Sequence, residues 1–78
     1  MKLVLICDEK KIYEGEVLQV DVETANGKVT ILPQHQPYMA KIFGSVSYTP
    51  TDANTVSINT TEGFIYTDGT TCFTVLDE

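Results

Sequence analysis

The chain has 78 residues and a net charge of −6, which arises from five lysines, no arginine and eleven acidic residues. This length accommodates one domain, residues 1–78, and the scattered lysines form no basic stripe, so nucleic-acid binding is not expected. No apolar run nears the roughly 18 residues needed to cross a bilayer, and we therefore expect no direct membrane insertion.

The first predicted strand covers residues 2–7 and contains the apolar run from Leu3 to Cys7. This run is too short for a signal peptide, so we expect the chain to stay in the compartment in which it is made. Disulfides are rare in the reducing interior of the cell. Cys7 and Cys72 are therefore predicted to be reduced thiols.

Strict alternation of apolar and polar residues marks the next part of the chain. It predicts strands near residues 12–13, 16–24 and 28–33, because side chains on a half-buried strand alternate between two faces. Asn26-Gly27 is a two-residue hairpin signal between the last two strands. The alternation places Leu18, Val20 and Val22 on the inward face.

The segment from Pro33 to Pro37 interrupts the strands and contains the only histidine, His35. Both prolines restrict the backbone, so this segment is predicted to be a defined loop. His35 has two possible roles: a general base or metal ligand, or a loop histidine that hydrogen-bonds its neighbours or a partner. One histidine and two distant cysteines do not make a metal cluster, so no metal site is predicted.

The second half of the chain continues the alternation, with strands predicted near residues 38–43, 45–49, 55–61, 64–67 and 71–76. Val56, Ile58, Phe73 and Val75 are assigned to the inward face, whereas Tyr38-Met39 is either an exposed apolar pair or part of the core. Many short strands at close spacing predict an all-β fold, a sandwich or a barrel, with no long helix.

Acidic pairs are the second catalytic candidate in the sequence, after His35. Two carboxylates can hydrolyse a glycoside, but that reaction needs a cleft, and short strands in a chain of this size rarely enclose one. We therefore predict no catalytic residue, no cofactor-binding residue and no enzymatic activity, and expect the acids to be solvated. The pairs are Asp8-Glu9, Glu14 with Glu16, and Asp77-Glu78.

The order of several short motifs resembles the N-terminal domain of the epsilon subunit of rotary F-type ATP synthase. The matching elements are Tyr13 to Val17, Gly27 to Pro33, and then His35 and Pro37 of a loop that reads "leu-pro-gly-his-ala-pro" in the family. Further matches are Ile42 to Val46, Glu62 to Ile65, and Thr74 to Leu76. The family loop glycine and alanine are replaced by Gln34 and Gln36, and Lys28 and Thr30 also depart from its pattern.

The resemblance implies a small flattened β-sandwich of about ten short, mostly antiparallel strands. The usual epsilon chain continues into two helices that inhibit ATP hydrolysis, and the sequence given ends at Glu78. We therefore expect a single domain without that helical hairpin and without its inhibitory function.

The function implied by the resemblance is that of a non-catalytic subunit of the rotating central stalk. It would join the gamma subunit to the membrane c-ring during proton-driven ATP synthesis, as a monomer within the complex. Its place would be peripheral, on the cytoplasmic face of an energy-transducing membrane, most simply a bacterial inner membrane.

The site residues are also implied by the resemblance, position by position. The c-ring contact is assigned to the turn at Asn26, Gly27 and Lys28. The gamma contact is assigned to Cys7, His35, Gln36, Pro37, Tyr38, Met39 and Ala40.

Two other functions stay open from the sequence. The chain could be a free-standing β-sandwich adaptor that binds another protein or a small ligand, or a small hydrolase that uses the acidic pairs.

Overall fold

Six β-strands account for most of residues 1–77, the part of the chain that the computed structural model describes. No helix capable of crossing a bilayer occurs in these residues. The all-β prediction is confirmed, but the structure has six strands where about ten were expected. The strands are β1 (Lys2–Cys7), β2 (Lys10–Thr24), β3 (Gly27–Ile31), β4 (Tyr38–Pro50), β5 (Val56–Thr67) and β6 (Thr71–Asp77).

The difference in strand number arises because predicted short strands join into longer ones. Segments 12–13 and 16–24 form one strand, as do 38–43 with 45–49, and 55–61 with 64–67. The register shifts between Ile42 and Gly44, and Gly44 adopts a φ of 97°. A bulge of this kind bends a strand without ending it, because an extra residue is left unpaired while the ladder continues on both sides.

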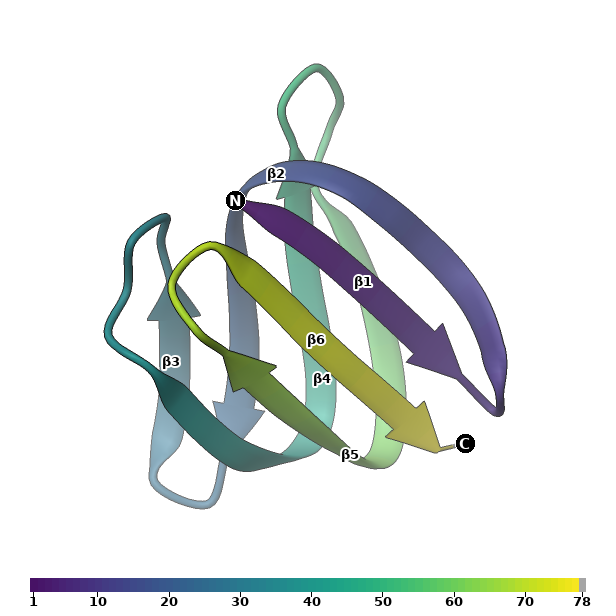
Figure 1. The fold of residues 1–78 in the computed structure, drawn as a ribbon. Helices are drawn as coiled ribbons and strands as arrows, with labels where there is room; N and C mark the ends of the chain where they lie inside the picture. The colour runs from purple at the N-terminus through teal and green to yellow at the C-terminus, as the bar shows by residue number, and fades with distance from the viewer. Residues whose placement is uncertain (78) are drawn as a thin grey trace.

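The strands follow the order β1-β6-β5-β4-β2-β3, and an additional pairing of β1 with β2 closes the sheet on itself. The β1–β6 pair is parallel and all other pairs are antiparallel. In Figure 1, β1, β6, the first half of β2 and the second half of β5 lie in front, whereas β3, the second half of β2, most of β4 and the first half of β5 lie behind. The result is a flattened sandwich whose two layers share one core.

The core is formed by the side chains that point between the layers. Val20 and Val22 are buried as predicted, and Ile58 packs against the core while remaining half-buried. The buried threonines are hydrogen-bonded; Thr60 Oγ1, for example, donates to the carbonyl oxygens of Glu62 and Asp77. The buried apolar residues are Leu3, Leu5, Val17, Val20, Val22, Ile31, Ile42, Val46, Tyr48, Ile65, Cys72 and Leu76.

Four residues predicted to face inward are exposed instead. Leu18 points outward because a register shift between Val17 and Gln19 inserts an extra residue. Val56 pairs with the buried Tyr48 but lies at the first position of β5, where the sandwich is open. Phe73 and Val75 were assigned to the wrong side of β6, whose buried positions are Cys72, Thr74 and Leu76.

The two cysteines are thiols, as predicted. Cys72 is buried in the core, and burial raises the pKa of its thiol to about 11, because a thiolate there would lose its hydration. Such a thiol stays protonated and inert at neutral pH.

Candidate functional site

The outer side of the front layer carries a contiguous group of exposed apolar side chains, which we call the apolar face. The register places Phe64 opposite Val75, Tyr66 opposite Phe73, and Met39 opposite Tyr66. Residues opposite each other on neighbouring strands share a face, so these side chains form one patch across three strands. The apolar face consists of Met39 (65% exposed), Phe64 (47%), Tyr66 (45%), Phe73 (44%) and Val75 (48%).

Strand β1 extends the apolar face toward the edge of the layer. Val4 lies beside Phe73 and Ile6 lies beside Val75 in the parallel β1–β6 pair, and both are half-buried. The viewer in Figure 1 looks onto this side of β1, β6 and β5. Exposed apolar patches rimmed by polar residues mark sites of protein–protein contact more often than isolated surface residues do.

Charged residues border the apolar face on the β2 side. Lys2 Nζ lies 2.9 Å from Glu14 Oε2, and Lys11 Nζ also contacts this carboxylate. The hydrogen bonds from Lys11 and then Lys2 lower the pKa of Glu14 to about 2. An apolar centre with a charged, solvated rim is the usual anatomy of a protein interface.

The loop around His35 is attached to the turn between β5 and β6, at one end of the apolar face. Gln34 N donates to Gly69 O at 2.8 Å, and His35 N donates to Leu32 O at 3.1 Å. A Cβ atom added to Gly69 would lie 2.9 Å from His35 O, so only glycine permits this approach. Asp68 Oδ1 accepts bonds from the backbone N–H groups of both Thr70 and Thr71, which fixes the turn.

The His35 side chain is occupied by its immediate neighbours. Nδ1 donates to the Gln36 carbonyl oxygen at 2.7 Å, and the ring meets Tyr38 edge-on with centroids 5.8 Å apart. The predicted gamma-contact residues from His35 to Ala40 therefore form one segment that leads into the exposed Met39. No group of three or more potential metal-ligating side chains occurs within residues 1–77.

Cys7 lies apart from that segment. It pairs with Leu76 at one end of β6, whereas the His35 loop contacts Gly69 beyond the other end. At about 3.3 Å per residue the two are separated by roughly 20 Å along the strand direction. The apolar face, which the sequence analysis missed, lies between the two positions, and the Cys7 side chain itself packs against the core rather than on this face.

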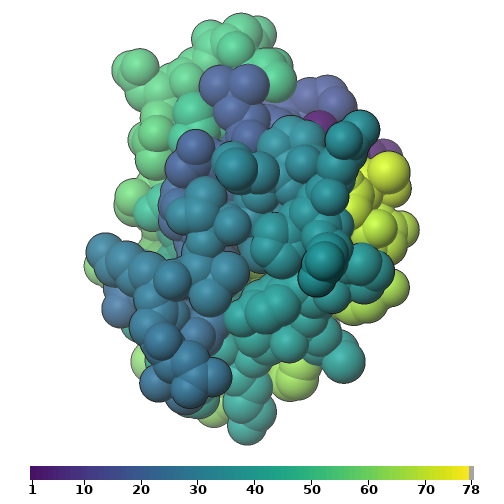
Figure 2. All heavy atoms as spheres, turned by 90° about the vertical axis from the view of Figure 1, so that its left-hand side faces the viewer, coloured from purple at the N-terminus to yellow at the C-terminus, as the bar shows by residue number. Residues whose placement is uncertain are grey.

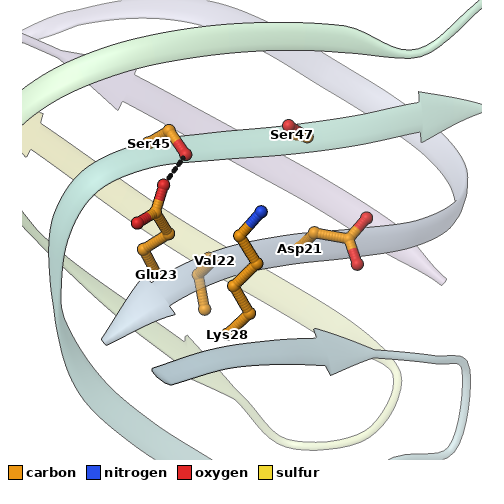
Figure 3. A pocket seen from close by; sticks show the side chains of 6 residues that line it. All are labelled: Asp21, Val22, Glu23, Lys28, Ser45 and Ser47. Carbon is orange, nitrogen blue, oxygen red and sulfur yellow. Dashed lines mark hydrogen bonds between the residues drawn. The ribbon is translucent and has the colours of Figure 1, made fainter. Parts of the chain in front are cut away.

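The predicted c-ring residues form the tip of the β2–β3 hairpin. Gly27 has a φ of 109°, and Thr24 Oγ1 donates to the Gly27 carbonyl oxygen at 2.9 Å. Lys28 lies opposite Glu23 in the β2–β3 ladder, and Figure 3 shows its side chain crossing β2 between Val22 and Asp21. The hollow there has a volume of only about 40 Å³, which suits a water molecule rather than a ligand.

The acidic pairs do not converge on a cleft. Glu14 is held by two lysines, and Asp8 and Glu9 lie in a tight turn with φ values of 51° and 70°. Asp77 ends β6, and Glu78 lies outside the described residues. The arrangement offers no pair of carboxylates placed for hydrolysis among the residues that are described.

Comparisons with known proteins give a consistent result. The family described as "ATP synthase, Delta/Epsilon chain, beta-sandwich domain" matches residues 1–78. The ATP synthase epsilon chain of Rhodococcus erythropolis is 30% identical over 80 residues, covering 100% of this chain and 65% of the relative. The ATP synthase epsilon chain of Micrococcus luteus is 34% identical over 65 residues, covering 82% of this chain and 71% of the relative. The chain thus spans slightly less than two thirds of the Rhodococcus relative.

Solved structures share the fold at low sequence identity. A chain of the Euglena gracilis mitochondrial ATP synthase superposes with a TM-score of 0.86 and 16% identity, covering 95% of this chain and 48% of that one. A chain from the central stalk and c-ring of the Tetrahymena thermophila mitochondrial enzyme superposes with a TM-score of 0.84 and 13% identity, covering 99% of this chain and 63% of that one.

Proposed function

The chain belongs to the family of the ATP synthase delta/epsilon chain β-sandwich domain, and on that premise we propose that it joins the gamma subunit to the c-ring in a rotary ATP synthase. The family is that of a non-catalytic chain. In this proposal the domain performs no bond chemistry, turns with its two partners and transmits torque between them.

The apolar face is the observation that carries the proposal. Five large apolar side chains are exposed on one side of the domain, although the solvent-facing positions of an antiparallel sheet are usually polar. Covering them would contribute roughly 25 cal/mol for each Å² of apolar surface removed from water. Aromatic residues and methionine are also the types enriched at protein interfaces.

The gamma subunit is assigned to this face because both predicted gamma-contact points border it. Cys7 lies near one end and the segment from His35 to Ala40 lies near the other. A partner that lies along β6 would touch both. Because Pro33 and Pro37 restrict the loop, little conformational entropy is lost when it binds.

The c-ring is assigned to the hairpin tip at Asn26, Gly27 and Lys28, which are all exposed. The tip extends at the bottom of the molecule in Figure 1. Asn26 lines one groove together with Met39 of the apolar face, whereas Gly27 and Lys28 do not line it, so the two partners would bind side by side. We further propose that the domain acts as a monomer in the complex, peripheral to the cytoplasmic face of a bacterial inner membrane.

A binding measurement with the purified gamma subunit tests this proposal. Met39 is largely exposed, so Met39→Asp is expected to fold normally yet to place an unpaired charge in the interface. Isothermal titration should show tight binding of the unmodified chain and a large loss for Met39→Asp. Leu18→Asp, which changes another exposed apolar residue outside the apolar face, should bind as the unmodified chain does.

Failure of the unmodified chain to bind gamma would overturn the proposal and favour an adaptor for another protein. The c-ring contact has its own test: Asn26→Cys should form a disulfide with cysteines placed in the polar loops of the c-ring, whereas Thr55→Cys at the opposite end of the domain should not.

A further inference from the structure

The first half of β4 has a ladder partner on one side only. Tyr38 to Ile42 pair with Thr67 to Gly63 of β5, but pairing of β4 with β2 stops at Val46 and Val22. Within residues 1–77, no backbone hydrogen bond outside the strand ladders reaches residues 38–43. These residues therefore present an open strand edge, a ready template for another extended chain.

The edge opens because β4 turns away from β2 at Gly44. One step beyond the last backbone pair, Val22 with Val46, a side-chain hydrogen bond still links the two strands: Ser45 Oγ donates to Glu23 Oε1 at 2.6 Å. Immediately before it, Gly44 adopts its φ of 97°, a conformation that other residues rarely adopt. The bend therefore separates the start of β4 from the β2–β3 hairpin tip.

A groove of about 390 Å³ lies between the separated segments. Figure 2 faces this side of the molecule, where the hairpin residues at the lower left adjoin the first residues of β4. Tyr38 and Ala40 face the interior and are half-buried, whereas Met39 and Phe43 are exposed on the outer side. The lining residues are Thr24, Ala25, Asn26, Tyr38, Met39, Ala40, Lys41 and Phe43.

The charge of the groove differs from that of the domain. Of the eight lining side chains only Lys41 carries a full charge at neutral pH, although the chain as a whole has a net charge of −6. The groove is therefore locally positive and complements an acidic side chain. Met39 belongs to both the groove and the apolar face, so the two surfaces are continuous.

We propose that the groove binds an extended segment of the gamma subunit, which adds a strand to the open edge of β4. Strand addition uses main-chain hydrogen bonds for affinity and alternate side chains for specificity. The added strand carries apolar side chains on both of its faces, against Tyr38 and Ala40 on one side and against Met39 and Phe43 on the other. An acidic side chain lies near Lys41. This inference rests on the proposed function and specifies the chemistry of recognition.

Amide hydrogen exchange measured residue by residue by NMR tests the inference. In the free chain, alternate amides of residues 38–43 point to solvent and should exchange fast, while those bonded to β5 are slow. With saturating gamma subunit, the fast set should slow at least tenfold. Lys41→Glu should weaken gamma binding about tenfold, and Thr55→Glu, at an exposed position at the opposite end of the domain, should change it less than twofold.

Each outcome decides between the claims. If gamma binds tightly but the fast amides of residues 38–43 stay fast, strand addition is wrong and docking on the apolar face remains. If gamma does not bind the unmodified chain, both the proposed function and the strand addition are wrong. If Lys41→Glu and Thr55→Glu weaken gamma binding equally, the proposed contact between Lys41 and an acidic side chain of gamma is wrong.

Discussion

The two outer faces of the sandwich have opposite chemistry. On the front layer, β5 and β6 direct Phe64, Tyr66, Phe73 and Val75 toward solvent. On the rear layer the outward positions are polar apart from Leu18 at the β2 bulge, and we call this polar surface the polar face. It consists of Gln19, Asp21, Glu23, Lys28, Thr30, Ser45, Ser47, Thr49, Ser57 and Asn59.

The polar face is largely satisfied within the domain. Thr30 Oγ1 donates to Asp21 Oδ1 at 2.6 Å, and the hydroxyl groups of Ser47 and Ser57 lie 2.9 Å apart. Strand β5 crosses both surfaces, contributing serine and asparagine to one and aromatic residues to the other. The fold therefore accepts polar residues at such positions, and the aromatic residues of the apolar face point to a partner instead.

The largest expected effect is a loss of gamma binding when the apolar face is given a charge. Phe73→Asp should cost roughly 3–5 kcal/mol of binding free energy, because the carboxylate becomes desolvated and unpaired in the complex. Titration calorimetry measures this loss. Ser57→Asp on the polar face is the control. If it weakened gamma binding as much as Phe73→Asp does, the claim that only the apolar face binds gamma would be wrong.

A smaller effect, on stability, is expected at Gly63 beneath the apolar face. A Cβ atom there would lie 2.7 Å from both Leu76 Cδ2 and the backbone oxygen of Val75, and the backbone cannot move aside easily. Gly63→Ala should lower the free energy of unfolding by about 1–3 kcal/mol. Chemical denaturation measures this loss. Gly27→Ala gives a contrast: nothing lies within 4 Å of a Cβ atom added there, so its cost comes from the φ of 109° and not from a steric clash. A Gly63→Ala variant as stable as the unmodified chain would contradict the packing described.

On the polar face, removing one hydrogen bond should have a modest effect on stability and none on gamma binding. Ser45→Ala deletes the donor to Glu23 Oε1 and should lower the free energy of unfolding by about 1 kcal/mol. Denaturation and titration of the same variant measure both quantities. Weakened gamma binding without loss of stability would show that the polar face also binds the partner.

The smallest effect concerns the rim of the apolar face and is a pH dependence. The pKa of Glu14 is lowered from 4.5 to about 2, so its contribution to stability is complete above pH 4.5 and is lost as pH falls toward 2. In the Glu14→Gln variant the melting temperature should therefore vary less with pH between 4.5 and 2 than it does in the unmodified chain. Added salt should shrink the difference, because the group is exposed. Identical pH profiles would contradict the ion pairs with Lys2 and Lys11.

The sequence predicted the all-β fold and the hairpin at Asn26-Gly27, because period-two alternation and turn chemistry are local signals. It could not tell which side of β6 is inside, since Phe73 and Val75 are more hydrophobic than the buried Thr74. That choice depends on which strands β6 joins. The bulge at Leu18 was missed for the same reason, because a register shift is visible only against the partner strand.

The sequence indicated only parts of the candidate surface, and the contacts assigned to them stay predictions. The loop at His35 and the hairpin tip came from resemblance to a family, whereas the apolar face emerged only when strands distant in sequence were paired. One signal was available in β5: Phe64 and Tyr66 alternate with Ile65 and Thr67, so both sides of this half of the strand carry large or β-branched residues. Strands covered on both sides show such a pattern.

The central claim is that the apolar face is the surface that gamma covers, and side-chain footprinting with hydroxyl radicals tests it most directly. Exposed apolar residues occur on and off this face, so one experiment contains its own control. On adding the gamma subunit, labelling should fall at Met39, Phe64, Tyr66 and Phe73 and stay unchanged at Leu18 and Val56. Protection of Leu18 and Val56 with continued labelling of Phe64 and Phe73 would contradict the claim.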